Sequence, residues 1–470
     1  MDLIFDKGTI LLQNPPPRLD LSKISGLKWD PRVNSYRSPA YNLPTIQHYI
    51  AQNDIEISKT IWNFPPFPGQ WKQVDLRPYQ EAALCAWNLG SQRGIIVLPT
   101  GSGKTHVAIA AMARNPRRTL VLVPTRILLQ QWHQQLIHFF SGQVGVYGDS
   151  SRELGPVTVA TFESAYRHMC HFGNQFEQLI IDEVHHFGNG VRDEALEMSL
   201  APFRLGLTAT MPHDTNLIDR MSQLVGPPIY ELTVSDLSGT YLSNFDLIKI
   251  QLDLTPAERN CYEIHIGVFN EVFSYFRKSF PEASWKDFAC WASRTDQGRK
   301  SLQALHQARC IINFAVRKEE ILASMLARHR HNKILIFTAD TNTAYKISKK
   351  YLVMPITADI KRKEREEALL RFRSGQLNTL VSCRVLNEGL DVPDAEVAII
   401  IGGMHGEREH IQRIGRLLRP KPGKRACIYE LVCNDTVEVR QSQKRRKGLG
   451  SKNTFNLQPK EQSDPAAFFG

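Results

Sequence analysis

The segment LPTGSGKT at residues 98–105 has the composition of a loop that holds the phosphates of a nucleotide. It follows the apolar run GIIV and precedes HVAIAAMA, which predicts a strand, a loop and a helix in that order. The glycines allow backbone N–H groups to close around a phosphate, and the start of the helix adds positive potential. We expect Lys104 to reach the β- and γ-phosphates and the Thr105 hydroxyl to hold Mg²⁺. The predicted phosphate-binding residues are Thr100, Gly101, Ser102, Gly103, Lys104 and Thr105.

A second segment, IIDEVHH at residues 180–186, is acidic, and its Asp182 lies 78 residues after Lys104. Its apolar run delivers Asp182 to the end of a strand, where the carboxylate is placed to bind the Mg²⁺ shell, and Glu183 is placed to orient and deprotonate a water. A strand end with two solvated acids is the alternative, but the context of the phosphate loop disfavours it. His185 and His186 are not spaced like a zinc site, so we expect them to couple the nucleotide to a neighbouring loop.

Three arginines, Arg413, Arg416 and Arg419, recur at every third position in QRIGRLLR, residues 412–419. This spacing places them near one helical face. A solvated basic stripe would have the same pattern. Our hypothesis is that Arg416 and Arg419 belong to a second lobe and approach the γ-phosphate when the two lobes close.

Short apolar runs alternate with longer amphipathic segments, first from about Arg93 to Pro212 and again from KILIFT onward. This rhythm predicts parallel sheets with crossover helices, and its interruption predicts two α/β lobes. The runs in the first series are GIIVLP, TLVLVP, VTVAT, QLIIDE and RLGLTAT, and those in the second are KILIFT, TLVSC, VAIII and CIYELV.

The remaining segments differ from this rhythm. Leu254–His331 is rich in aromatic and charged residues at helical spacing and is predicted to be a helical insertion. We expect a small N-terminal domain at 1–66, lobe 1 at 67–234, lobe 2 at 235–440 including the insertion at 254–331, and a basic, disordered tail at 441–470.

Composition limits the class of protein. The hydrophobic content of 42% and charged content of 22% are those of a globular protein, and the net charge of +11 favours polyanionic partners. No run approaches the roughly 20 apolar residues that span a bilayer, and the N-terminus lacks a signal pattern. The eight cysteines form no CxxC pair, so no zinc or iron–sulfur site is expected. We therefore expect a protein that is not secreted, cytoplasmic in a prokaryote or nuclear in a eukaryote.

Together with LRPYQ at 76–80, TAT at 208–210 and NEGLDVP at 387–393, these segments resemble the motif series of superfamily 2 helicases in order and spacing, from Leu76 to Arg419. The resemblance implies two RecA-like lobes that hydrolyse ATP with Mg²⁺. In the general phosphate-loop pattern a Gly stands first, and the Leu98 of this chain is a variant found in helicases. The implied roles are adenine recognition by Gln80 and Arg77; nucleotide contacts from lobe 2 by Gly389 and Asp391; coupling by Thr208, Thr210 and Gln412; and nucleic-acid contact by Pro124, Thr125, Arg126 and Thr161.

Within that superfamily the chain resembles the XPB family of DNA repair helicases in its short prokaryotic form. The likeness is carried by GLKWDPRVNSYRSPAY, LRPYQEAAL, DEVHH, LGLTATMP and VGPPIYELTVSDL, and by the position of the helical insertion. It implies a damage-recognition-like N-terminal domain, a thumb that grips DNA and 3′→5′ polarity. One departure bears on strand separation: the family's Arg-Glu-Asp triplet is replaced by Pro212, His213 and Asp214, so only the last acid is kept.

These observations favour an ATP-dependent DNA helicase or translocase acting on single-stranded, forked or duplex DNA in repair, such as nucleotide excision repair. Two alternatives remain open: an ATP-driven subunit that opens DNA for a partner nuclease, which the altered residues His213, Asp214 and Thr215 motivate, and an RNA-dependent ATPase.

Three further segments carry alternative interpretations. KRKEREEALLRFR at 361–373 is predicted to be a solvated helix rather than a DNA contact, because its charges alternate at helical spacing. VEVRQSQKRRKG at 437–448 is either a nonspecific phosphate contact or a solubilising tail. The C-terminal spacing of Gln462, Pro465, Phe468 and Phe469 is similar to the peptide that sliding clamps bind, with Pro465 where a larger aliphatic residue is usual; a chance occurrence is the other interpretation.

Overall fold

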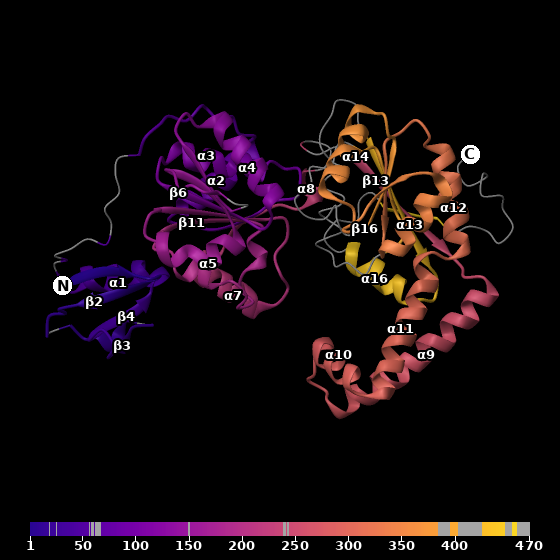
Figure 1. The fold of residues 1–470 in the computed structure, drawn as a ribbon, viewed down its shortest axis with the longest axis horizontal. Coiled ribbons are helices and arrows are strands. Elements are labelled where there is room, and N and C mark those ends of the chain that lie inside the picture. The colour runs from indigo at the N-terminus through magenta and orange to yellow at the C-terminus, as the bar shows by residue number, and fades with distance from the viewer. Residues whose placement is uncertain are drawn as a thin grey trace. The chain divides into compact units, whose positions relative to one another are not determined.

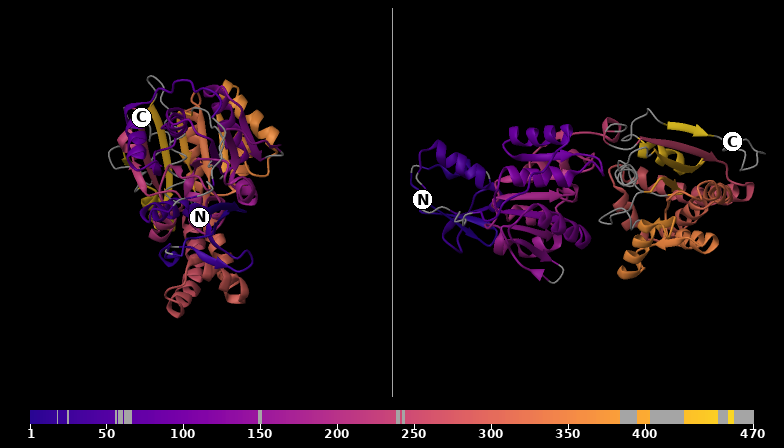
Figure 2. Two further views of the ribbon diagram at one scale, coloured as in Figure 1. Left: turned by 90° about the vertical axis from the view of Figure 1, so that its left-hand side faces the viewer. Right: turned by 90° about the horizontal axis from the view of Figure 1, so that it is seen from above.

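The computed structural model shows a chain that divides into two compact units, one formed by residues 1–233 and the other by the described residues from Val234 onward (Figures 1 and 2). The structure describes residues 1–17, 19–24, 26–55, 57, 61, 67–148, 151–237, 241, 244–383, 395–402, 425–446 and 454–457.

The N-terminal part of the first unit is an antiparallel sheet with one helix packed on it. The strands are β1 (Asp2–Asp6), β2 (Thr9–Gln13), β3 (Lys28–Asp30) and β4 (Ser35–Pro39), in the order β1-β2-β4-β3, and the helix is α1 (Leu43–Gln52). The predicted run LIFDKGTILLQ is therefore a hairpin, and its turn residues Lys7 and Gly8 have φ of 47° and 85°, as tight two-residue hairpin turns require. Leu200, from the following domain, packs into the core of this sheet.

The rest of the first unit is an eight-stranded sheet in the order β12-β5-β11-β10-β6-β9-β7-β8, parallel except at β8. The strands are β5 (Arg93–Val97), β6 (Thr119–Val123), β7 (Val144–Gly148), β8 (Ser151–Arg152), β9 (Val157–Thr161), β10 (Gln178–Asp182), β11 (Phe203–Thr208) and β12 (Pro228–Glu231). The helices are α2 (Pro78–Leu89), α3 (Lys104–Arg114), α4 (Arg126–Phe139), α5 (Phe162–Phe172), α6 (Glu194–Glu197) and α7 (Thr215–Leu224). In Figure 1, α2, α3 and α4 cover one face of this sheet and α5 and α7 the other.

The second unit contains a seven-stranded sheet in the order β15-β16-β14-β17-β18-β13-β19, in which every described pair is parallel. Its strands are β13 (Asn244–Leu252), β14 (Ile334–Thr338), β15 (Met354–Ile356), β16 (Thr379–Cys383), β17 (Val397–Ile400), β18 (Arg425–Cys433) and β19 (Thr454–Leu457). Its helices outside the insertion are α8 (Val234–Leu237), α12 (Val316–Arg328), α13 (Thr341–Tyr351), α14 (Arg362–Ser374) and α16 (Val437–Arg446). The expected α/β class with two parallel-sheet lobes is confirmed.

The C-terminal region differs from the disordered tail predicted from Gln441 onward. Helix α16 continues to Arg446, and β19 pairs with β13 at the edge of the sheet, where the two strands lie side by side in Figure 2. The physical reason is that β13 offers an open row of backbone groups to β19, while the buried Ser442 hydroxyl donates to Glu430 Oε2 at 2.9 Å and fixes α16. Residues 458–470, with the clamp-like spacing, lie outside the described residues.

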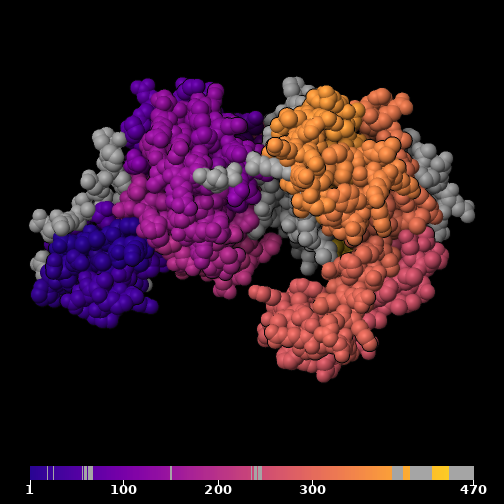
Figure 3. Space-filling view, viewed as in Figure 1, coloured from indigo at the N-terminus to yellow at the C-terminus, as the bar shows by residue number. Residues whose placement is uncertain are grey.

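The helical insertion consists of α9 (Pro256–Ser279), α10 (Trp285–Arg294) and α11 (Asp296–Asn313). It forms a distinct protrusion of the second unit (Figure 3), held together by an aromatic cluster around Phe288, which is fully buried against Phe269, Phe273 and Phe276. The predicted insertion extended to His331, but α12 packs its Ile321, Leu322 and Met325 into the core of the sheet, so that end was wrong. Among the described helices, none is both long and apolar enough to cross a membrane.

A buried ion pair joins the root of the insertion to the sheet of the second unit. Lys318 on α12 is 0% exposed and donates to Glu438 on α16 at 2.8 Å, to Ile312 O on α11 at 2.7 Å and to Ile401 O after β17 at 2.6 Å. Because both charges are out of water, the Lys318 ammonium needs these acceptors, and Glu438 Oε2 also accepts Cys433 N at 2.9 Å. One side chain therefore fixes three separate segments.

A buried arginine stabilises the edge of the first unit's parallel sheet at which β11 begins. Arg204 on β11 is 0% exposed and donates to three carbonyls, those of Ala201, Leu224 and Ser199, at 2.9, 2.5 and 2.8 Å. Burial lowers the pKa of its guanidinium, because desolvation opposes the charge. The Arg204 carbonyl accepts the indole N–H of Trp87 at 3.0 Å.

We predict that Arg204→Met destabilises the protein by about 3 kcal/mol, because the three buried carbonyls lose their donors. Arg204→Lys should also be destabilising. The guanidinium reaches the three carbonyls through three different nitrogens, Nε, Nη1 and Nη2, whereas a lysine has a single nitrogen. Equilibrium urea unfolding of the full chain measures both. Arg114→Met, which removes an exposed arginine paired with Glu81, serves as the control and should shift stability by less than about 1 kcal/mol. Equal effects at the two arginines would contradict the assignment.

Candidate functional site: a phosphate loop, an acidic strand end and two basic pockets

The predicted phosphate loop joins β5 to α3, as the sequence indicated. Gly101 and Gly103 have φ of 84° and 81°, a left-handed region that favours glycine. Lys104 begins α3, and its Nζ donates back to Leu98 O at 3.1 Å and Pro99 O at 3.4 Å. The buried Thr100 hydroxyl has no hydrogen-bond partner among the described residues. A cradle of backbone groups with an unsatisfied hydroxyl fits a phosphate ligand.

Helix α2 closes this loop from one side. Gln80 accepts from Arg77 N at 2.9 Å through Oε1 and donates to Ser102 O at 2.8 Å through Nε2. A Cβ added at Gly103 would collide with Gln80 Nε2, so this close approach requires the glycine. Burial lowers the pKa of His106, and the positive charge of Arg77 lowers it further, which places Arg77 near the first turn of α3. The structure therefore brings Gln80 and Arg77 to the loop.

Asp182 ends β10 as predicted, and both of its carboxylate oxygens are held. Oδ1 accepts Glu183 N at 3.0 Å and Oδ2 accepts the indole N–H of Trp132 at 2.8 Å. Burial raises the pKa of Asp182, whereas the Trp132 hydrogen bond and the positive charge of Lys104 oppose that shift. A carboxylate close to Lys104 and a hydroxyl at Thr105 are oxygen ligands of the kind that Mg²⁺ takes, so the residues fit the ion.

Glu183 occupies a strained backbone position directly after Asp182. Its φ of 53° and ψ of 48° are left-handed, which is uncommon for a non-glycine residue and is found at functional sites. The side chain is mostly buried, and its Oε2 lies 3.3 Å from His185 Nδ1.

A hydrogen-bonded chain links this acidic segment to the TAT segment. His185 Nδ1 lies 2.9 Å from Thr208 Oγ1, and that hydroxyl donates to Thr210 O at 2.9 Å. Because the hydroxyl has one hydrogen, it accepts from His185, which assigns the ring proton to Nδ1. The expected coupling residues Thr208 and Thr210 are thus joined to the DEVHH segment.

Three of the four predicted nucleic-acid contacts of the first unit, Pro124, Arg126 and Thr161, line one pocket of about 370 Å³, whereas Thr125 does not line it. Thr125 and Thr161 are the N-caps of α4 and α5, accepting Leu128 N at 3.3 Å and Ser164 N at 3.2 Å. The two hydroxyls therefore fix the starts of two helices. The pocket also contains basic residues that the sequence analysis missed, and burial with the charges of Arg152 and Arg167 lowers the pKa of His168. Its lining includes Pro124, Arg126, Arg152, Thr161, Arg167 and His168.

Comparison of the sequence with known proteins identifies the family to which this chain belongs. Residues 73–213 match the family described as "Type III restriction enzyme, res subunit", and residues 317–421 match "Helicase conserved C-terminal domain". Residues 3–59 match "Xeroderma pigmentosum group B helicase damage recognition domain". The chain is 35% identical over 425 residues to the "DNA 3'-5' translocase XPB2" of Sulfurisphaera tokodaii, covering 90% of this chain and 96% of that protein. The chain belongs to the XPB family.

One further relative agrees with this family, and one solved structure agrees with the fold. The "DNA 3'-5' helicase XPB" of Kineococcus radiotolerans is 30% identical over 77% of this chain, which spans only 60% of that longer relative. The Pyrococcus furiosus Hef helicase domain superposes with a TM-score of 0.53 at 18% identity, covering 79% of this chain and 98% of that one. That likeness establishes the fold of two RecA-like lobes.

The position of the XPB family's Arg-Glu-Asp triplet has a local structural role in this member. Asp214, the one acid kept, caps α7 by accepting Asn216 N at 2.9 Å. Because its carboxylate accepts this hydrogen bond, Asp214 stabilises the start of α7. The sequence could have indicated this, because Asp before an amphipathic segment is a typical N-cap signal.

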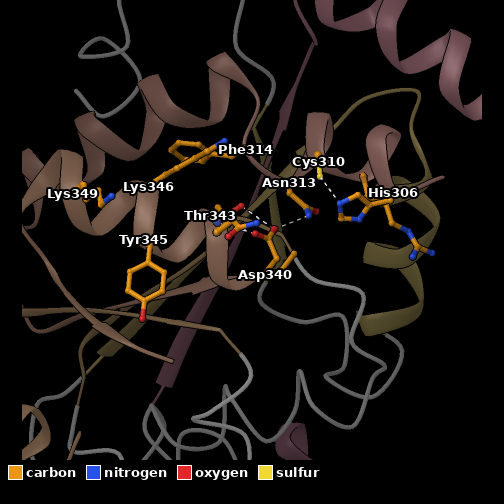
Figure 4. A pocket seen from close by; sticks show the side chains of 12 residues that line it. His306, Cys310, Asn313, Phe314, Asp340, Thr343, Tyr345, Lys346 and Lys349 are labelled. Carbon is orange, nitrogen blue, oxygen red and sulfur yellow. Dashed lines mark hydrogen bonds between the residues drawn. The ribbon is translucent and has the colours of Figure 1, made fainter. Parts of the chain in front are cut away.

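In the second unit of this XPB-family chain, α11 and α13 enclose a pocket of about 580 Å³ that sequence reasoning missed (Figure 4). Asp340 caps α13 through Thr343 N at 2.8 Å and accepts Asn313 Nδ2 at 3.0 Å, which joins the two helices. Arg309 Nε is buried with no hydrogen-bond partner among the described residues, and burial lowers the pKa of the guanidinium. The basic lining residues are His306, Arg309, Lys346 and Lys349.

Several predicted site residues lie outside the described residues. They are Gly389, Asp391, Gln412, Arg413, Arg416 and Arg419. Their expected roles therefore stay predictions.

We predict that Thr208→Val lowers the ratio of DNA-stimulated to basal ATPase activity by about tenfold, because one buried hydrogen bond between the acidic and TAT segments is lost. Steady-state ATPase assays with and without DNA measure the ratio. Thr119→Val removes an equally buried hydroxyl from β6 and is the matched control. An unchanged ratio in Thr208→Val, or the same fall in the control, would show that this link does not couple DNA to hydrolysis.

Proposed function

We infer that this chain is an ATP-hydrolysing DNA helicase or translocase that moves with 3′→5′ polarity. The observation that carries the inference is the connection, within one sheet, of the phosphate loop, the Asp182–Glu183 pair, the Thr208 link and a basic pocket. The names of the relatives from Sulfurisphaera and Kineococcus support the same substrate and polarity.

In the proposed mechanism, the backbone N–H groups of the loop and Lys104 bind the phosphates, and Gln80 and Arg77 recognise the adenine. Thr105 and Asp182 would hold Mg²⁺, and the bound ion would neutralise charge on the phosphate oxygens. Glu183 orients the attacking water and accepts its proton. His185 and Thr208 transmit the change to Thr210. Arg416 and Arg419 complete the site from the second lobe.

We predict that Lys104→Ala abolishes ATP hydrolysis and that Glu183→Gln lowers it by about 10²–10⁴-fold, because the proton acceptor is lost. Both variants should keep most of their DNA affinity, since the basic pockets are unchanged, and Glu183→Gln should still bind ATP. ATPase and DNA-binding assays measure these effects. Full turnover in either variant would remove the central assignment, and stronger stimulation of the native protein by RNA than by DNA would favour the RNA-dependent alternative.

The DNA backbone occupies the pocket of the first unit in this proposal. Strands β6 and β9 are parallel neighbours, with Val123 opposite Thr161, so the starts of α4 and α5 lie side by side. Two helix N-termini and three arginines therefore face one pocket, and both features attract phosphate. Glu163 in the same lining pairs with Arg167 at 2.7 Å and Arg192 at 3.2 Å, which neutralises much of its charge. The pocket between α11 and α13 offers a second phosphate contact from the other lobe.

We predict that Arg126→Ala and Arg152→Ala each weaken DNA binding uniformly across sequences and reduce the slope of log K against log salt by about 1. Both side chains are exposed, so stability should not change. Fluorescence anisotropy with labelled single-stranded and duplex DNA over a salt series measures the slope. Arg114→Ala, on α3 outside either pocket, is the matched control. Slopes equal to that of the native protein would exclude this pocket as a phosphate contact.

The role in DNA repair is also a proposal, and the match of residues 3–59 to a damage recognition domain supports it. The replaced triplet, whose Asp214 is a helix cap, favours opening of DNA for a partner nuclease as the second candidate activity. A strand-displacement assay on forked DNA distinguishes them, because a DNA-opening subunit hydrolyses ATP without processive unwinding. A sliding clamp that binds Gln462–Phe469 remains a proposed partner.

A further inference from the structure

Trp132 makes a contact that the proposed mechanism does not use. It lies on α4 with 2% of its surface exposed, and its indole N–H donates to Asp182 Oδ2 at 2.8 Å. Leu129, Trp132 and Leu136 form the buried face of the helix. A buried tryptophan needs an acceptor, and a backbone carbonyl would satisfy it. Here the acceptor is instead the carboxylate expected to hold Mg²⁺.

The sheet explains why these two side chains meet. Strand β10 pairs with β6 in parallel, with Ile181 opposite Leu122, so Asp182 ends next to the connection from β6 into α4. Trp132 sits two turns into that helix, whose first residue, Arg126, lines the basic pocket. The same rigid helix therefore touches the predicted DNA contact at its start and the acidic strand end at its middle.

The carboxylate of Asp182 is restrained from two sides. Glu183 N holds Oδ1 and Trp132 Nε1 holds Oδ2, so rotation of the carboxylate would break at least one of two hydrogen bonds, of which the Trp132 bond is fully buried. A hydrogen bond to a metal-binding carboxylate from a residue that does not itself bind the metal orients the ligand and tunes its affinity.

We propose that Trp132 is a positioning residue that orients Asp182 for Mg²⁺ and connects the metal site to the DNA-contacting start of α4. The inference rests on the proposed function, since it requires Asp182 to hold Mg²⁺. Its consequence is that α4 transmits DNA binding to the metal site directly, in addition to the route through His185 and Thr208.

The test substitutes Trp132→Phe, which keeps an aromatic ring and removes the N–H donor. Trp87→Phe is the matched control, because Trp87 is a fully buried tryptophan on α2, a helix that packs on the same sheet, and its N–H donates to a backbone carbonyl, that of Arg204. Both variants lose one buried hydrogen bond and similar packing. Only Trp132→Phe changes the environment of Asp182.

The first readout is the Mg²⁺ concentration that gives half-maximal binding of fluorescent ADP to the full chain. We expect Trp132→Phe to raise it by roughly tenfold, the lower end of the effect of such supporting residues on metal affinity. Binding of the same ADP in excess chelator should be unchanged, and Trp87→Phe should match the native protein. DNA should lower the Mg²⁺ requirement of the native protein and have little effect on that of Trp132→Phe.

A second measurement needs no substitution. In protein labelled with ¹⁵N at the indole nitrogens, the Trp132 resonance should shift when Mg²⁺ is added to the ADP complex, and the Trp87 resonance should not. If Mg²⁺ shifts neither resonance, or if both phenylalanine variants have the native Mg²⁺ requirement, the inference is overturned while the proposed function stands. A native protein that binds no Mg²⁺–ADP would instead overturn the proposed function.

Discussion

Parallel pairing of five neighbouring strands is the constraint on which the first unit's chemistry depends. Registers place Val97 beside Thr208, Leu207 beside Asp182 and Val123 beside Thr161, so β5, β11, β10, β6 and β9 end along one edge. At that edge every strand leads into a helix start or a functional loop. Backbone hydrogen bonding therefore makes the phosphate loop, the acidic pair, the TAT segment and the basic pocket neighbours, although Val97 and Thr161 are 64 positions apart in the sequence.

The same constraint explains why buried polar groups are concentrated at the two ends of this sheet. At the functional edge, Trp132, Asp182, His185 and Thr208 satisfy one another, and each hydrogen bond orients a group with a proposed role. At the opposite end, Arg204 satisfies three carbonyls, and nothing there faces a proposed ligand. Buried polar contacts of similar quality thus serve stability at one end and orientation at the other, and the difference follows from where the strands end.

Much of this organisation is readable from the sequence because the motifs are local. Apolar runs bounded by turn residues predicted β5, β6, β9, β10 and β11, and the loop and the DEVHH segment followed from their spacing. The contacts between distant residues were not readable. Trp132 in QQWHQ has the pattern of an ordinary core position, and only the pairing of β6 with β10 shows that its N–H reaches Asp182. The N-capping by Thr125, Thr161 and Asp214 was missed because the resemblance had assigned those positions to other roles.

The second unit was harder to predict for a topological reason. Strand β13 precedes the helical insertion, yet its partners are β18 and β19, which come more than 170 residues later. Local periodicity does not reveal such pairing. Lys318 connects the insertion to this sheet: its Nζ donates to Ile312 O, in the last turn of α11, and to Ile401 O, just after β17. The chain runs from Ile401 toward Arg416 and Arg419. The buried ammonium group of Lys318 therefore ties the root of the insertion to the strand that precedes, in the sequence, the arginines proposed to act on the γ-phosphate.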